Sequence, residues 1–333
     1  MADIPVVSVI IPLYNKRPYV KRAIESVRQQ TFSRWELIIV DDGSTDGSAD
    51  EIPADDPRIR ILRQTNRGPS SARNRGIEAA QGEVITFLDA DDYYYPGKLK
   101  EETDLLLKEQ LAEWMISAFD YESGSDEIRT QYIKDIDGED IKGDLRVFGD
   151  ALHHLQRGFW PVDGLCVKRD LLKRIGGFNE GLRCYEIAEL IFRCALEQPK
   201  IAIYAKPLYR VVDVTNSAFK IQHNKIEGER RFGERLYKLA KDFPAYEDIL
   251  LTRSNSKLVS YVFALLRSGQ GREARRYLAT HYPYAHDRVW WKLWIGSCFP
   301  QWLFQPLYKL LRLMKRKKTG MDIGCNSNCV LLP

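Results

Sequence analysis

The sequence predicts an α/β fold, in which a mostly parallel sheet is flanked by helices and followed by a helical extension. Over the first hundred residues, short apolar runs rich in β-branched residues alternate with stretches of helical periodicity. Strands that are separated by helices pair in parallel through right-handed crossovers. From about residue 220 to residue 284 the pattern is wholly helical.

The first four strands are expected where the β-branched runs occur, at Val6–Ile11, Glu36–Val40, Arg58–Leu62 and Glu83–Leu88. Helical patterns lie between and after them, at Pro18–Gln30, Ser70–Gln81 and Pro96–Gln110, with a short turn near Asp46–Ile52. Pro69 suits the start of the second helix, because its missing N–H is not needed there.

The second half of the α/β region is less regular, and we extend the domain to about residue 220. Strands are expected at Trp114–Tyr121, Val162–Val167, Ile201–Tyr204 and Leu208–Val212, and a helix at Glu186–Glu197. The extension carries amphipathic helices at Lys225–Asp242, Tyr246–Arg267 and Arg272–His281. We therefore divide the chain into an α/β domain (1–220), a helical extension (221–284), an aromatic and basic segment (285–318) and a tail without an assigned role (319–333).

The composition excludes several classes of protein. A chain of 333 residues with 44% hydrophobic residues, 22 Gly and 15 Pro is neither disordered nor collagen-like. The net charge of only +4 gives no reason to expect a nucleic-acid partner. The six cysteines form no C-x-x-C pair, and no signal peptide is evident at the N-terminus, so we expect a cytoplasmic protein with reduced thiols.

Polar residues follow the predicted strands where each strand ends. Pro12–Asn15 follow the first strand, Asp41–Gly47 the second and Asp89–Asp92 the fourth. In an open parallel sheet, ligands bind outside the carboxyl ends of the strands, so carboxylates from two strands should converge there. Such carboxylates repel one another unless a cation lies among them, which predicts a hard divalent ion, Mg²⁺ or Mn²⁺. Alternatively, each segment is an ordinary Asp-rich turn.

The same segments carry a family resemblance, which covers about residues 4–215. The four blocks are Val7–Asn15, Glu36–Gly47, Asn66–Gly68 with Ala72–Asn74, and Phe87–Asp92. In order and spacing they resemble the family 2 inverting glycosyltransferases of GT-A fold. The resemblance implies an enzyme, a hexosyl- or N-acetylhexosaminyl-transferase, that uses a nucleotide-sugar donor, with a UDP-sugar favoured. It also implies a carbohydrate or lipid-linked acceptor, as in the synthesis of polysaccharides or glycolipids.

The resemblance further implies roles for individual residues. Pro12 and Tyr14 would line the base pocket, Asp41 would hydrogen-bond the base, and Arg73 would lie near the base or diphosphate. Asp89 and Asp91 would be the Asp-x-Asp pair, with Asp91 as the direct metal ligand and Asp89 facing the ribose or the metal. The full set expected to bind the donor is Pro12, Tyr14, Asn15, Asp41, Asp42, Arg73, Asp89, Ala90 and Asp91.

An inverting transfer also needs a base to deprotonate the acceptor hydroxyl, and here the chain departs from the family. The family's Gly-Gly-Phe-acid turn resembles Gly176–Glu180, but the Glu-Asp pair that normally follows it is Glu186 and Ile187. Glu186 is therefore the first candidate for the base, with Glu189 and Asp163 as alternatives. If none of them serves, either another residue is the base or the chain is a non-catalytic nucleotide-sugar-binding or partner protein of the same fold. A dinucleotide-dependent oxidoreductase is disfavoured, because the Gly-x-Gly-x-x-Gly turn is missing after the first strand.

The segment 285–318 combines tryptophans with eight basic residues and one acid, Asp287. Its longest uncharged stretch, Leu293–Tyr308, has 16 residues and is shorter than the ~20 that a spanning helix needs. We expect it to contact an anionic membrane peripherally, on the inner face of the cell membrane. The other interpretation is that the tryptophans pack on the α/β domain and the basic residues are solvated.

Overall fold

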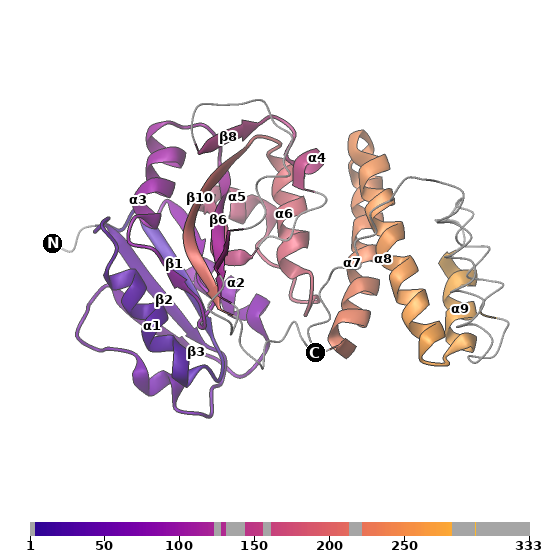
Figure 1. Cartoon of the computed structure of the whole chain (residues 1–333), viewed down its shortest axis with the longest axis horizontal. Coiled ribbons are helices and arrows are strands. Elements are labelled where there is room, and N and C mark those ends of the chain that lie inside the picture. The colour runs from indigo at the N-terminus through magenta and orange to yellow at the C-terminus, as the bar shows by residue number, and fades with distance from the viewer. Residues whose placement is uncertain are drawn as a thin grey trace. The chain divides into compact units, whose positions relative to one another are not determined.

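The computed structural model describes residues 4–122, 128–130, 144–155, 161–212 and 222–281, together with Ser297 (Figure 1). The chain divides into two compact units, residues 1–250 and 251–333. The first unit contains the predicted α/β fold, and its described residues include a ten-stranded sheet of order β3-β2-β1-β4-β9-β6-β10-β5, with β7 beside β6 and β8 beside β10. The strands are β1 (Val7–Leu13), β2 (Trp35–Asp41), β3 (Ile59–Arg63), β4 (Val84–Phe87), β5 (Tyr93–Tyr94), β6 (Trp114–Glu122), β7 (Ile128–Thr130), β8 (Leu145–Phe148), β9 (Leu165–Lys168) and β10 (Ile201–Val212).

The parallel pairing that the alternating pattern predicts is confirmed for the first four strands. β1 lies between β2 and β4 and pairs in parallel with both, and β2 pairs in parallel with β3. β6 and β10 form the other parallel pair. β9 lies antiparallel between β4 and β6, so one strand of reversed direction joins the two parallel groups.

Helices cover both faces of this sheet. They are α1 (Arg17–Arg28), α2 (Pro69–Ala79), α3 (Lys98–Thr103), α4 (Ala151–Leu155), α5 (Arg169–Ile175), α6 (Glu186–Glu197) and α7 (Gln222–Asp242), with one-turn helices η1 (Ser48–Glu51), η2 (Asp104–Lys108), η3 (Val162–Gly164) and η5 (Pro244–Tyr246). Because side chains alternate across a strand, Val9 of β1 packs in the same core cluster as Ile24 of α1. Ile10 faces the opposite way, toward Gly76 of α2, where a Cβ would lie 2.5 Å from the isoleucine.

The predicted helical extension begins inside the first unit. Phe232 of α7 stacks on Tyr185 with ring centroids 5.3 Å apart and meets Phe192 edge-on at 6.0 Å. These aromatic contacts join α7 to α6, so α7 shares the core of the α/β fold.

The second unit is helical. Most of α8 (Glu247–Arg267) and all of α9 (Gly271–His281) belong to it, and Tyr261 meets Tyr277 edge-on at 4.8 Å. Apart from Ser297, the segment 285–318 and the tail 319–333 lie outside the described residues. Within the described ranges, no helix has both the length and the apolar character needed to cross a membrane.

Candidate functional site

The strand register brings the polar segments together at one edge of the sheet. Leu13 at the end of β1 pairs with Asp41 at the end of β2, and Ile10 pairs with Phe87 at the end of β4. Because the three strands are parallel, the residues that follow them leave the sheet on the same side. The predicted convergence of Pro12–Asn15, Asp41–Gly47 and Asp89–Asp92 is therefore present in the fold.

The segment after β1 offers an exposed aromatic ring and a turn residue. Tyr14 is 46% exposed, whereas Pro12 is partly buried in the strand. Asn15 has a positive φ of 51°, which asparagine tolerates better than most residues. Its Oδ1 accepts a 2.8 Å hydrogen bond from the backbone N–H of Thr45. Asn15 thus fixes the loop after β1 to the loop after β2.

Asp41 and Asp42 are both buried, and their contacts differ. Asp41 accepts a 2.9 Å hydrogen bond from the backbone N–H of Ser44 and closes its own turn. Asp42 accepts bonds from the Gln64 side chain and from the backbone N–H groups of Arg67 and Gly68, at 2.8 to 2.9 Å. Asp42 therefore holds the loop before α2 and orients the helix that carries Arg73.

Arg73 joins three elements at the centre of the site. Its side chain is only 4% exposed, and its Nη2 donates a 2.7 Å hydrogen bond to Asp89, just beyond β4. Its Nη1 lies 3.5 Å from Glu186, the first residue of α6. The guanidinium also lies 5.3 Å from the centroid of the Phe178 ring. A buried cation thus links an Asp-x-Asp residue to the first candidate for the base.

Two buried carboxylates lie beneath the Asp89 turn. Asp163 of η3 is 1% exposed and accepts a 2.6 Å hydrogen bond from the backbone N–H of Asp89. Asp92 is 5% exposed and accepts a 2.8 Å bond from the backbone N–H of Val212. Burial, and then the neighbouring carboxylates, raise the pKa of both Asp92 and Asp163. Among the described residues, Oδ2 of Asp163 has no hydrogen-bond partner.

Asp91 points elsewhere. Its Oδ2 lies 2.5 Å from Nζ of Lys16, at the start of α1, and its backbone carbonyl accepts a 3.0 Å bond from Arg22. Ala90, between the two aspartates, is buried. In the Asp-x-Asp segment, Arg73 thus pairs with Asp89 and Lys16 pairs with Asp91.

The donor set fits a hard divalent cation. One carboxylate oxygen from each of Asp89, Asp92 and Asp163 lies within 4.8 Å of the other two, and Asp91 belongs to the same turn as Asp89 and Asp92. Mg²⁺ and Mn²⁺ prefer carboxylate ligands and leave coordination positions for phosphate oxygens. Asp89 and Asp91 are the more accessible members, with side chains 35% and 15% exposed, so a cation bound with a substrate would meet these two first.

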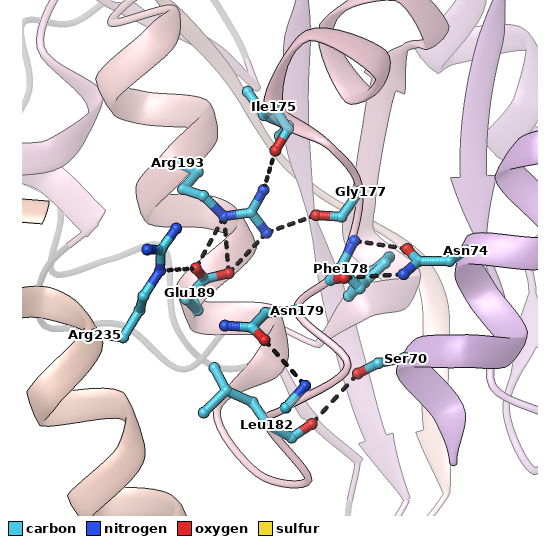
Figure 2. A network of polar contacts seen from close by, with 11 residues as sticks. Ser70, Asn74, Ile175, Gly177, Phe178, Asn179, Leu182, Glu189, Arg193 and Arg235 are labelled. Carbon is cyan, nitrogen blue, oxygen red and sulfur yellow. Dashed lines mark hydrogen bonds and ion pairs between the residues drawn. The ribbon is translucent and has the colours of Figure 1, made fainter. Parts of the chain in front are cut away.

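Glu189, the second candidate for the base, lies in a separate polar network (Figure 2). It is fully buried, and its two oxygens accept hydrogen bonds of 2.7 to 2.9 Å from Arg193 of α6 and Arg235 of α7. Arg193 also donates to the backbone carbonyls of Ile175 and Gly177. Glu189 therefore has a structural use: it orients the arginine that holds the Gly-Gly-Phe turn.

Asn74 of α2 holds the same turn from the other side. Its amide accepts a 2.7 Å bond from the backbone N–H of Phe178 and donates a 2.9 Å bond to the carbonyl of that residue (Figure 2). The paired bonds set the Phe178 ring against Arg73, one residue earlier on α2. The turn that precedes the candidate base is thus fixed to the helix that holds Asp89.

Sequence reasoning missed Lys16 and the role of Asn74, and it assigned no role to Asp92 beyond its place in the Asp89–Asp92 segment. Lys16 follows the polar Pro12–Asn15 segment directly, and Asp92 follows the Asp-x-Asp pair. Their position next to these segments was the signal in the sequence that could have identified them. The sequence shows Asn74 only as part of the Ala72–Asn74 block, because its partner Phe178 is 104 residues away.

Comparisons with known proteins find glycosyltransferases. Residues 8–152 match the model of glycosyl transferase family 2. The chain is 32% identical over 225 residues to the uncharacterized glycosyltransferase EpsJ of Bacillus subtilis (strain 168), covering 66% of this chain and 64% of the relative. It is 39% identical over 122 residues to the putative glycosyltransferase EpsH of the same organism, covering 34% and 36%. The matches thus span less than two thirds of these relatives.

Solved structures share the fold at low sequence identity. S. aureus TarS 1–349 in complex with UDP-GlcNAc has a TM-score of 0.59 at 18% identity, covering 87% of this chain and 79% of that chain. The mannosyltransferase PcManGT from Pyrobaculum calidifontis, in complex with GDP-Man and Mn²⁺, has a TM-score of 0.55 at 18% identity, covering 95% and 84%. The α/β unit is therefore a GT-A fold. Over residues 8–152 the sequence is similar to glycosyl transferase family 2.

Proposed function

We propose that this chain is a metal-dependent inverting glycosyltransferase, which moves a sugar from a nucleotide-diphosphate sugar to an acceptor hydroxyl. The observation that carries the proposal is the position of Arg73, which joins Asp89 and Glu186 at the carboxyl ends of the strands. The positively charged guanidinium of Arg73 thus lies between the proposed donor side and the proposed base. The family match supports glycosyl transfer as the reaction.

For the donor, we propose that Tyr14 and Pro12 line the pocket of the base and that Asp41 hydrogen-bonds it. Asn15 and Asp42 support these residues by fixing the two loops that flank them. Relatives of the fold bind UDP-GlcNAc and GDP-Man, and we favour a UDP-sugar for this chain.

For the metal, we propose Mn²⁺ or Mg²⁺ on Asp91 and Asp89. A bound divalent ion stabilises the departing nucleoside diphosphate as a Lewis acid, so that no protein acid need protonate it. Asp163 holds the main chain at Asp89 by accepting a hydrogen bond from the backbone N–H of that residue. Asp92 holds the turn against β10 by accepting a hydrogen bond from the backbone N–H of Val212.

For the base, we propose Glu186. A base must have a carboxylate oxygen that can reach the acceptor hydroxyl. Glu189 uses both oxygens on arginines, and Asp163 is buried beneath the Asp89 turn. Glu186 lies at the first turn of α6 with its side chain 12% exposed, and the Arg73 guanidinium is 3.5 Å away. Arg73 can orient this carboxylate and stabilise its charge.

A second candidate function has one observation in its favour. Ile187 stands where the family's usual aspartate base would be, so a non-catalytic nucleotide-sugar-binding protein of the same fold is the competing proposal. The test is release of nucleoside diphosphate from a panel of UDP- and GDP-sugars with Mn²⁺ or Mg²⁺, with simple glycosides and lipid-linked glycans as acceptors. Acceptor-dependent release from one donor, abolished by chelator, supports the enzyme. Donor binding without release for any acceptor favours the competing proposal.

We further propose that the segment 285–318 contacts anionic lipid peripherally, which would bring the enzyme to a lipid-linked acceptor at the inner face of the cell membrane. The proposal rests on the tryptophans and basic residues of that segment. Flotation of the full chain with vesicles containing anionic lipid should be lost when Lys315, Arg316, Lys317 and Lys318 are changed to glutamine. Unchanged flotation would contradict this part of the proposal.

A further inference from the structure

We propose that Lys16 is a built-in counter-ion of Asp91, which a divalent cation must displace in order to bind there. This inference rests on the proposed metal site and assigns to Lys16 the control of its affinity. The observation is the ion pair itself: Nζ of Lys16 lies 2.5 Å from Oδ2 of Asp91.

The pair is positioned by the fold. Lys16 is the residue that precedes α1, and its backbone N–H donates a 2.9 Å bond to the Ser48 hydroxyl in the loop after β2. The Lys16 and Asp91 side chains are only 23% and 15% exposed. An ion pair that is partly withdrawn from water is screened less than a surface pair, so replacing the ammonium carries a larger cost.

The ammonium is not needed to hold the turn in place. Arg22 of α1 binds the backbone carbonyl of Asp91 at 3.0 Å, and the backbone N–H of Asp92 bonds to the carbonyl of Asp89 within the turn. Asp163 binds the backbone N–H of Asp89 from below. Because these contacts use the main chain, removal of the Lys16 charge should free the Asp91 carboxylate without moving the turn.

An ammonium and a divalent cation cannot both contact one carboxylate oxygen without strong repulsion. Lysine carries its charge on a flexible four-carbon stem, so it can leave Asp91 by rotating its side chain. Metal binding therefore includes the cost of breaking the Lys16–Asp91 pair. The chain should consequently bind the metal alone more weakly than a chain whose Asp91 has no lysine partner.

The experiment measures Mn²⁺ binding to the full chain without nucleotide, from the electron paramagnetic resonance signal of the free ion. The variants are Lys16→Gln, Arg17→Gln and Asp91→Asn. Arg17 is the matched control: it is the next residue, it carries the same charge, and its side chain is 60% exposed and pairs with Glu51 at 3.1 Å. Lys16→Gln should bind Mn²⁺ at least about threefold more tightly than the unmodified chain, and Arg17→Gln should match that chain.

Three results would overturn the inference. The Mn²⁺ affinity of Lys16→Gln could be unchanged or weaker while Asp91→Asn loses binding, in which case the metal site stands and the role of Lys16 does not. Arg17→Gln could gain as much as Lys16→Gln, which would reduce the effect to overall charge. Asp91→Asn could bind like the unmodified chain, which would reject the proposed metal site together with this inference. Thermal unfolding of each variant verifies that it is folded.

Discussion

Arg73 donates a 2.7 Å hydrogen bond to Asp89 from a side chain that is almost fully buried. The bond joins the middle of α2 to the turn after β4, and the two residues are sixteen positions apart in the sequence. A guanidinium can contact two carboxylates at fixed angles, and Arg73 also reaches toward Glu186 on α6. The proposed donor side and the proposed base are thus connected through one side chain.

The first prediction concerns the geometry of Arg73. Arg73→Lys keeps the charge but loses the planar fork, so we expect the affinity for the nucleotide donor to fall by about tenfold or more. Isothermal titration calorimetry with the nucleotide would measure this loss. Arg75→Lys is the matched control, because Arg75 is on the same helix but donates to the exposed backbone carbonyl of Arg63. Equal affinities for the two variants would contradict the assigned role.

The second prediction separates the two glutamates of α6. Glu186→Gln should lower the turnover number by about a hundredfold or more with little change in donor affinity, because general-base catalysis is lost. Glu189→Gln should instead lower the melting temperature, since it removes the buried negative charge that neutralises Arg193 and Arg235. Steady-state kinetics and thermal unfolding of both variants are the measurements. A turnover number within a few-fold of the unmodified chain in Glu186→Gln would move the base elsewhere.

The third prediction concerns the turn before α6. Gly176 and Gly177 both have positive φ, 78° and 65°, so alanine at either position costs about 1 kcal/mol of stability. At Gly177 a Cβ would also lie 2.6 Å from the Asn74 side chain, whereas at Gly176 it would meet nothing within 4 Å. We expect Gly177→Ala to unfold at a lower temperature than Gly176→Ala and to lose donor affinity, because Asn74 no longer fixes Phe178. The same melting temperature for both variants would argue against the Asn74 clamp.

The fourth prediction concerns two buried thiols. Burial raises the pKa of Cys194 to about 12 and raises the pKa of Cys166 well above its usual value. Because the thiolate is the reactive form, neither thiol should be labelled by a maleimide at pH 8 in the folded protein, and both should react once it unfolds. Peptide mapping by mass spectrometry distinguishes them from the other cysteines. Rapid labelling of Cys194 in the folded state would contradict the packing of α6.

The raised pKa of Cys194 also makes the stability of the fold depend on pH. Between pH 9 and about 12, the unfolded chain loses the Cys194 proton while the folded chain keeps it. Deprotonation therefore favours unfolding, and this contribution to stability is complete below pH 9 and disappears as the pH rises toward 12.

The longer elements, such as β1, β2, α1 and α6, were predictable because each carries its own periodic signal, whereas the short elements β5, β7, β8 and α5 were not predicted. β1 and β2 have continuous apolar runs, since both faces of these strands are covered, and α6 has an amphipathic pattern that depends only on local sequence. The antiparallel direction of β9 was not predictable, because the sequence of a short apolar strand does not determine whether it pairs parallel or antiparallel. Only its pairing with β4 and β6 decides its direction.

The site was predictable to the extent that its residues follow strands. Asp41, Asp89 and Asp91 were located from the topology of a parallel sheet and from the family resemblance. Their partners were not, because Lys16 and Asp91 are separated by 75 residues, and Asn74 and Phe178 by 104. Nor could the sequence show that Glu189 is fully buried between two arginines, since the second of these comes from α7.

The most direct test of the central claim, a metal-dependent nucleotide site at the strand ends, is thermal unfolding of the purified chain with nucleoside diphosphates and nucleotide sugars. Each ligand is measured with Mn²⁺, with Mg²⁺ and with chelator, on the unmodified chain and on Asp91→Ala. A ligand at about 100 times its dissociation constant adds roughly 2.7 kcal/mol of stability, which is a readily measured shift. We predict a shift with one nucleotide that requires the metal and is lost in Asp91→Ala. No shift with any nucleotide, or an equal shift in Asp91→Ala, would contradict the claim.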